Sequence, residues 1–165
     1  MSKQVPSPEE CARMGASCAC FNLRRATRAV TQLYDAHFDK IGLRTTQFNV
    51  LAVLGYDPEA RRTISELADI LVLDQSSLSR NLAVLEREGY VKLTAGDDKR
   101  QRVVTLTRTG RGLLAKGVPV WKKAQSEVAS LMSGSDLEHS MSSLRKMTKA
   151  AVAARADTRA ARASR

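Results

Sequence analysis

Residues 75–107 have the sequence QSSLSRNLAVLEREGYVKLTAGDDKRQRVVTLT, in which a helical pattern gives way to a strand pattern. In the first part, leucines recur every three or four residues, at Leu78, Leu82 and Leu85. This spacing predicts a helix with one apolar face, and Gly89 is suited to end it. In the second part, residues 90–94 and 102–107 are rich in Val, Leu and Thr and flank a polar turn. They predict the two strands of a β-hairpin.

Helical patterns lie on both sides of this stretch. We predict helices over residues 17–40, 45–54 and 64–71 before it, and over residues 108–132 and from 136 after it. Pro119 is expected to kink the helix that begins at residue 108. The order of three helices and a hairpin over residues 45–106 is the winged helix-turn-helix plan. The predicted fold class is therefore mainly α with a small β-hairpin wing, an α+β arrangement.

These patterns divide the chain into five segments. Apolar stripes on the first helix and on the last two are too extensive for one small lobe to cover, which predicts a homodimer. The expected segments are a flexible N-terminal arm (1–16), an N-terminal dimerisation helix (17–44), a winged helix-turn-helix DNA-binding lobe (45–107), C-terminal dimerisation helices (108–150) and a basic tail (151–165). The Ala- and Arg-rich tail either extends the last helix or is disordered, and composition does not decide between the two.

The charge balance favours a polyanionic partner. The 165 residues include 27 Lys and Arg and 17 Asp and Glu, a net charge of +10. Seven of the basic residues and one acid lie between Arg145 and Arg165, so the rest of the chain carries only +4. The apolar stretches are shorter than the ~20 residues of a membrane span, and the N-terminus lacks the pattern of a secretory signal. We therefore expect a cytoplasmic location.

The polar face of the helix predicted over residues 75–88 has residue types that suit DNA. Small side chains, hydroxyls and arginines lie on or near it, at Ser76, Ser79, Arg80, Ala83 and Arg87. Small residues let a helix approach the floor of the major groove, while Ser and Arg supply donors to base edges and phosphates. The alternative is an ordinary amphipathic helix with a solvated polar face.

The turn of the predicted hairpin is polar and partly basic. A basic side chain on a thin hairpin can reach the minor groove, whose negative potential attracts arginine. Arg100 is suited to this role, and Asp98 stands two residues before it, where a bidentate contact could hold its guanidinium. The alternative is a charged turn that only favours solubility.

Three linked motifs resemble the signature of the MarR family of winged helix-turn-helix transcription regulators. They are Leu85-Glu86-Arg87-Glu88-Gly89-Tyr90-Val91, then Asp98-Lys99-Arg100, then Leu106-Thr107-Arg108-Thr109-Gly110. The upstream run Ile64-Ser65-Glu66-Leu67-Ala68 also resembles the first helix of that family's helix-turn-helix. The resemblance covers most of residues 20–150, and several motifs in the same order are more specific than any one of them.

This resemblance implies a homodimer that binds a palindromic operator on double-stranded DNA. Carried over by position, the residues at the DNA are Gln75, Ser76, Ser77, Ser79 and Arg80 on the helix and Asp98, Lys99, Arg100 and Arg102 at the wing. Many family members are repressors released by small aromatic or lipophilic effectors. The implied effector pocket would draw on Phe21, Tyr34, His37, Phe48 and Trp121, each of which has plain core packing as its alternative.

The three cysteines, Cys11, Cys18 and Cys20, all lie near the N-terminus. Some MarR-type proteins sense oxidants through an N-terminal cysteine, so redox or soft-metal sensing is one interpretation. A thiol at the start of a helix can also gain reactivity from the helix. The other interpretation is that the thiols are small apolar groups packed in a dimer interface. Their spacing is not that of a zinc site, and the sequence predicts neither a metal site nor a cofactor.

Two other classes of protein are alternatives to a transcription regulator. A thiol oxidoreductase using Cys18 or Cys20 with His37 would need C-x-x-C and alternating strands and helices, which are absent from the sequence, as are the common nucleotide-binding and hydrolase motifs. We therefore expect no enzymatic activity. A non-specific architectural DNA-binding protein, or a winged helix that binds proteins, is the second alternative, and the basic tail supports it.

Overall fold

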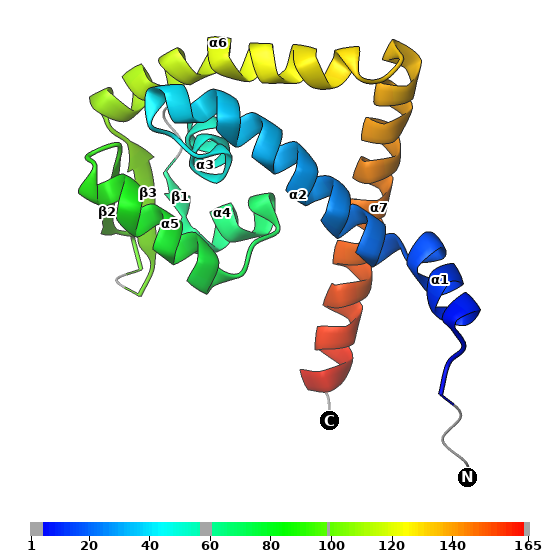
Figure 1. The fold of residues 1–165 in the computed structure, drawn as a ribbon. Coiled ribbons are helices and arrows are strands. Elements are labelled where there is room, and N and C mark those ends of the chain that lie inside the picture. The colour runs from blue at the N-terminus through cyan, green and yellow to red at the C-terminus, as the bar shows by residue number, and fades with distance from the viewer. Residues whose placement is uncertain (1–4, 57–60, 99, 164–165) are drawn as a thin grey trace. The chain divides into compact units, whose positions relative to one another are not determined.

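The structure is a computed structural model that describes residues 5–56, 61–98 and 100–163 (Figure 1). Its elements are α1 (Pro8–Ser17), α2 (Ala19–Phe38), the short 3-10 helix η1 (Asp39–Ile41), α3 (Thr45–Gly55), β1 (Arg62–Thr63), α4 (Ile64–Leu71), α5 (Gln75–Arg87), β2 (Val91–Ala95), β3 (Arg102–Leu106), α6 (Arg108–Ser130) and α7 (Gly134–Ala163). The chain forms two compact units, residues 1–124 and 125–165, and the boundary falls within α6.

A small antiparallel sheet and four helices form the core of the first unit. The sheet has the order β1-β3-β2, with Val91 opposite Leu106 and Leu93 opposite Val104. The apolar faces of α3, α4 and α5 converge on it, and their innermost residues are fully buried: Leu51, Leu67, Leu78, Leu82, Leu85 and Val104. The predicted class, mainly α with a small β wing, is confirmed.

Side-chain caps fix where α4 and α5 begin. Thr63 Oγ1 accepts from Glu66 N at 3.2 Å, and Glu66 Oε2 accepts from Thr63 N at 2.7 Å, which together form a capping box. Asp74 Oδ1 accepts from Ser77 N at 2.8 Å at the start of α5. Between the two helices, Val72 adopts a left-handed conformation with φ of 52°, which few non-glycine residues do. The turn is therefore tight, and α5 starts at a defined residue.

The structure changes or extends the sequence-based expectations at four places, and the predicted kink at Pro119 stays a prediction. We predicted a flexible arm over residues 1–16, but residues 8–17 form α1, because Ser7 and Glu10 make a capping box and Pro8 occupies the first turn. The two-residue strand β1 adds a third strand to the hairpin. Helix α6 is not interrupted at Pro119. The last helix, α7, continues into the tail as far as Ala163, so helix extension is the alternative that the structure supports.

Helix α6 begins on the end of the sheet through a backbone contact at Gly110. Thr107 N donates to Tyr90 O at 3.1 Å, and Thr107 Oγ1 donates to Gly89 O at 2.7 Å. A β-carbon at Gly110 would overlap Tyr90 O, whereas one at Gly112 would meet nothing within 4 Å. The glycine of the Leu-Thr-x-x-Gly motif therefore permits the close approach of α6 to the strand.

This contrast predicts opposite effects for two alanine substitutions in one helix. Gly110→Ala should lower the free energy of unfolding by about 2–4 kcal/mol, because the added methyl must displace backbone. Gly112→Ala, the matched control, should be neutral or stabilising by up to about 1 kcal/mol, because alanine favours the helix. Urea unfolding of both variants checks this, and equal effects of the two substitutions would contradict it.

The cap of α5 also predicts a dependence of stability on pH. Hydrogen bonds from Ser76, the Ser77 backbone and the Ser77 side chain hold the pKa of the Asp74 carboxyl well below its usual range. A lowered folded-state pKa adds stability above the unfolded-state value of about 3.9, and this stability is lost as the pH falls further.

Asp74→Asn keeps a good capping residue and removes the charge. Wild type should therefore unfold at higher urea than this variant at pH 7, and the gap should narrow progressively below about pH 4. Urea titrations at pH 7, 5 and 3 measure it. A gap that stays constant down to pH 3 would show that the charge of Asp74 does not stabilise the fold.

Candidate nucleic-acid interface

Helix α5 has one fully buried face and one exposed face. Leu78, Leu82 and Leu85 are 0% exposed. The predicted DNA-contacting residues Gln75, Ser76, Ser79 and Arg80 are exposed, and Ser77 is half-buried at the edge between the two faces. Burial of the leucines fixes the rotation of the helix about its axis. The exposed polar side chains therefore point into solvent.

A chain of hydrogen bonds links the first turn of this exposed face. Ser76 Oγ donates to Asp74 Oδ1 at 2.5 Å, and Arg80 Nη2 donates to Ser77 Oγ at 3.3 Å. Ser77 is also bonded to Asp74, because its backbone N–H donates to Asp74 Oδ1 at 2.8 Å. One carboxylate therefore orders two serines directly and Arg80 through one of them.

Two further bonds tie α5 to its surroundings. Asn81 Nδ2 donates to Thr46 O of α3 at 3.2 Å, and Glu86 Oε1 accepts from Leu93 N of β2 at 3.1 Å. The second bond joins α5 directly to the backbone of the hairpin. The exposed face of α5 and the wing are therefore connected within the first unit.

The wing turn is held by the backbone. Gly96 N donates to Gln101 O, and Gln101 N donates to Asp98 O, both at 2.9 Å. Asp98 Oδ1 accepts from the backbone N–H of Arg100 at 2.9 Å. We expected Asp98 to hold the Arg100 guanidinium, but among the described ion pairs none joins the two, and the Asp98 carboxylate binds the backbone N–H of Arg100 instead. Arg100 and Arg102 are exposed, and Lys99 lies outside the described residues.

One basic residue near the wing was not foreseen. Arg61 Nη1 lies 3.6 Å from Asp97 Oδ1, and its side chain is 55% exposed. Arg61 precedes β1, which pairs with β3 and so brings this residue beside the hairpin. No sequence signal marks a two-residue strand, which is why Arg61 could not be assigned to the wing. The structure thus adds a third described arginine to this part of the surface, alongside Arg100 and Arg102.

The predicted effector residues lie in different environments. Phe48 is buried against Phe38, with ring centroids 4.7 Å apart. Tyr34 is buried, which raises the pKa of its hydroxyl, and His37 is half-buried. Phe21 is 48% exposed and lies 13 residues before Tyr34 on α2, about 20 Å along the axis. Trp121 is 39% exposed on α6.

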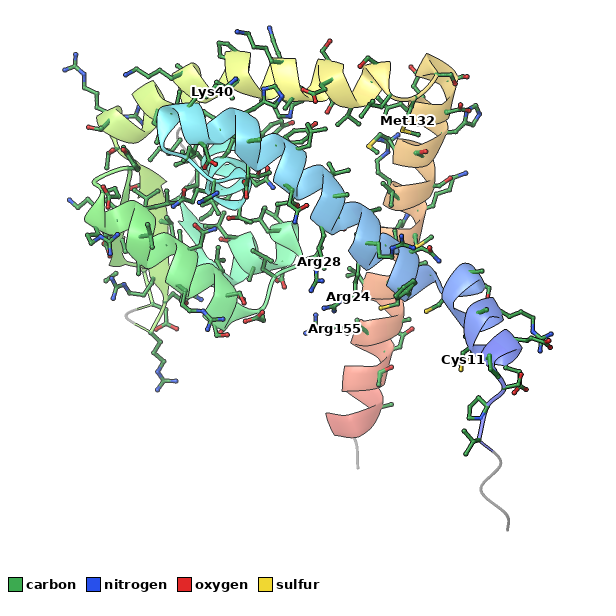
Figure 2. The ribbon with its side chains drawn as sticks, in the orientation of Figure 1. Cys11, Arg24, Arg28, Lys40, Met132 and Arg155 are labelled. Carbon is green, nitrogen blue, oxygen red and sulfur yellow. The ribbon has the colours of Figure 1, made fainter. Side chains whose placement is uncertain are left out.

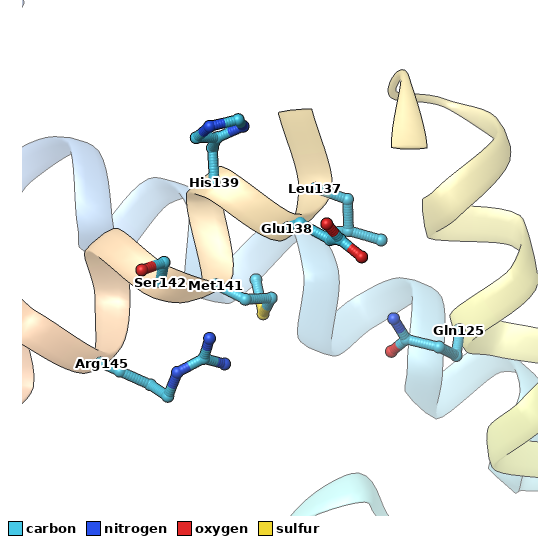
Figure 3. A pocket seen from close by; sticks show the side chains of 7 residues that line it. All are labelled: Gln125, Leu137, Glu138, His139, Met141, Ser142 and Arg145. Carbon is cyan, nitrogen blue, oxygen red and sulfur yellow. The ribbon is translucent and has the colours of Figure 1, made fainter. Parts of the chain in front are cut away.

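A hollow is present elsewhere, in the second unit (Figure 3). Its lining residues come from the end of α6 and the start of α7: Gln125, Leu137, Glu138, His139, Met141, Ser142 and Arg145. None of these residues belongs to the predicted effector set. The burial of Phe48 against Phe38 is consistent with core packing, and an effector pocket over the five predicted residues stays a prediction.

All three cysteines are exposed and unbridged. Cys11 lies on α1, as Figure 2 shows, whereas Cys18 separates α1 from α2 and Cys20 lies in the first turn of α2. Cys18 Sγ accepts from Phe21 N at 3.4 Å and so caps α2. Within the described residues, no group of three or more His, Cys, Asp and Glu side chains could hold a metal ion.

No helix in the described part of the chain is both long and apolar enough to cross a membrane.

Comparison with known proteins places this geometry in a family. A model of the MarR family matches residues 41–101, from the end of η1 to the wing. An uncharacterised HTH-type transcriptional regulator of Bacillus cereus is 33% identical over 98 residues, which are 59% of this chain and 63% of that protein. The match therefore spans somewhat less than two thirds of that relative.

Two other matches are more extensive. The transcriptional activatory protein BadR of Rhodopseudomonas palustris is 30% identical over 135 residues, covering 79% of this chain and 71% of BadR. The crystal structure of the Mycobacterium tuberculosis transcriptional regulator MosR in complex with DNA is 36% identical, covers 81% of this chain and 98% of that one, and superposes with a TM-score of 0.70. Together with the winged helix-turn-helix geometry, these matches show that the chain belongs to the MarR family of transcription regulators.

Proposed function

We propose that this protein is a homodimeric transcription regulator that binds specific DNA sequences. The observation that carries the proposal is the exposed face of α5, where Ser76, Ser79 and Arg80 stand opposite a fully buried leucine face. Small and hydroxylated residues permit close approach to the major groove, and arginine supplies donors for guanine or phosphate. The similarity to MosR, whose structure was solved in complex with DNA, supports DNA binding by this chain.

In this proposal the wing contacts the adjacent minor groove. Arg100 and Arg102 are exposed on the hairpin, and hydrogen bonds fix the turn that bears Arg100: Asp98 accepts from Arg100 N and Gln101 N, and Gly96 N donates to Gln101 O. A fixed turn lowers the entropic cost of placing an arginine in a narrow groove. Contacts to the minor groove add affinity and sensitivity to its width.

The proposed dimer rests on apolar side chains that the single chain leaves exposed. On α2, Phe21 and Val30 are 48% and 43% exposed. On α7, Met141, Leu144 and Met147 are 38%, 38% and 43% exposed and recur at helical spacing. A second copy that covers both helices would bury these side chains.

DNA binding would be controlled in one of two modes. Repression that ends when a small aromatic or lipophilic effector binds is one mode. Oxidation of a thiol is the other, and it is supported by the exposure of all three cysteines and by the place of Cys18 at the junction of α1 and α2. Because Cys18 caps α2, modification of its sulfur would remove that cap.

A non-specific architectural role is the second candidate. The observation that favours it is the basic surface of α7, where Arg145, Lys146, Lys149 and Arg155 are all exposed. Basic side chains on a long helix bind phosphates without regard to sequence. The two candidates differ in how strongly the protein discriminates between DNA sequences.

A symmetric dimer predicts a symmetric operator. Selection from random duplexes should yield a palindromic site whose half-sites lie about 10 base pairs apart, because two symmetric α5 helices enter successive major grooves. Sedimentation should show a dimer at micromolar concentration. A stable monomer, or a selected site without symmetry, would contradict the dimeric reading of α2 and α7.

The second prediction separates specific binding from charge-driven binding. Arg80→Ala should weaken binding to the selected site about 5- to 150-fold and binding to scrambled DNA much less, as expected for a contact to a base edge. Arg100→Ala should weaken binding to both without lowering the melting temperature. Deleting residues 150–165, with a net charge of +3, should weaken binding to both equally and flatten the salt slope by at most ~3 units.

Salt titrations on the selected and the scrambled duplex measure all three variants. Arg87→Ala is the matched control on α5, because the Arg87 guanidinium already pairs with Glu88 at 3.2 Å. If the tail deletion abolishes discrimination while Arg80→Ala preserves it, α5 is a scaffold and the architectural role is correct.

A further inference from the structure

Asp74 occupies the donor of the Ser76 hydroxyl and leaves its acceptor lone pairs unused. Ser76 Oγ lies 2.5 Å from Asp74 Oδ1, and Ser77 N lies 2.8 Å from the same oxygen. A hydroxyl has one proton to donate and two lone pairs with which to accept. An ionised carboxylate can only accept, so the proton between the two side chains is that of Ser76.

Ser76 Oγ can therefore bind a ligand only through its lone pairs, as an acceptor. Ser76 is exposed on α5, on the face opposite the buried leucines. To donate to a base, its hydroxyl would have to leave a charged acceptor, and a hydrogen bond to a charged group is about twice as strong as one to a neutral carbonyl. Ser76 is thus prepared to accept a hydrogen bond and not to donate one.

In the major groove, only two bases present a donor at their exposed edge. These donors are the exocyclic amino groups, N6 of adenine and N4 of cytosine, whereas guanine and thymine present acceptors there. A serine with a free hydroxyl would accept either kind of base, because it can rotate to donate or to accept.

We propose that Ser76 is a specificity-determining residue that accepts a hydrogen bond from the amino group of adenine or cytosine, and that Asp74 is the positioning residue that fixes this polarity. The inference rests on the proposed function, since it requires α5 to enter the major groove. It adds the chemical class of base that this position selects.

Ser77, whose backbone N–H binds the same carboxylate, provides the second hydroxyl of this turn. Ser77 Oγ accepts from Arg80 Nη2 at 3.3 Å, so Arg80 leans toward the start of the helix. A guanidinium has donors only, and guanine offers the acceptors O6 and N7. Since Arg80 follows Ser76 by one turn, about 6 Å along α5, an amino-bearing base and a guanine should lie within about two base pairs of each other in each half-site.

The experiment removes single functional groups from the DNA. In the selected operator, each adenine of a half-site is replaced in turn by purine, which lacks the N6 amino group, and each cytosine by pyrimidin-2-one, which lacks the N4 amino group. Dissociation constants are then measured for wild type, Ser76→Ala, Asp74→Gly and the control Ser79→Ala. Glycine is chosen at position 74 because it costs a helix N-cap little and has no side chain to accept the Ser76 proton.

At one position of the half-site, loss of the amino group should weaken wild-type binding about 3- to 10-fold, the range expected for one hydrogen bond. Ser76→Ala should lose this sensitivity at that position, whereas Asp74→Gly should keep it, because a free Ser76 hydroxyl can still accept from the amino group. Asp74→Gly should also bind guanine or thymine there better, relative to the original base, than wild type does. Ser79→Ala should keep the wild-type response, because within the described hydrogen bonds none joins Ser79 to a carboxylate.

Two results would overturn the inference while leaving the proposed function intact. In one, Ser76→Ala remains as sensitive as wild type to every amino group. In the other, the base whose contact Ser76→Ala loses is guanine or thymine, so that Ser76 donates. A different result, in which wild type binds selected and scrambled DNA equally, would reject the proposed function and the inference with it. Because Ser76→Ala leaves the Asp74 cap in place, the test stands even if Asp74→Gly unfolds.

Discussion

The complete burial of Leu78, Leu82 and Leu85 is the constraint on which the functional surface depends. A helix has one rotational setting in which these three side chains reach the core, and that setting determines which residues face outward. The polar residues of α5 are therefore presented by the packing of the core and not by contacts of their own. Any change that rotates α5 would move every candidate DNA contact on this helix at once.

The main features of this arrangement follow from periodicity, which is a strong signal in this chain. The leucine spacing, the change to β-branched residues after Gly89, and the capping pairs at Thr63 and Asp74 each have a local physical cause. Local causes are visible in sequence because they act between residues a few positions apart. For the same reason the exposure of Ser76, Ser79 and Arg80 could be predicted before the fold was known, and the structure agrees.

Other features could not be predicted from the sequence, because they depend on which of several hydrogen-bond donors a side chain binds or on pairing between distant segments. Asp98 had two donors within reach on Arg100, and the backbone N–H is the one it binds. Strand β1 exists only because β3 offers it a partner, so a two-residue segment carries no signal of its own. Phe48 was one of several aromatics suited to a ligand pocket, and only its packing against Phe38 identifies it as core. Residue type alone does not distinguish these outcomes.

Asp74 shows how a cap can influence discrimination as well as stability. Its carboxylate lies beside residues that would face DNA, where its negative charge repels phosphates of any sequence. That repulsion weakens binding to all DNA, and the net charge of +10 on the chain opposes it. The hydrogen bonds that Asp74 makes to Ser76 and Ser77 act differently, because they matter only where a base edge meets the serine. If α5 enters the major groove as proposed, a charge that lowers general affinity and fixes one hydroxyl would raise the ratio of specific to non-specific binding, which is the quantity that matters for a regulator searching a genome.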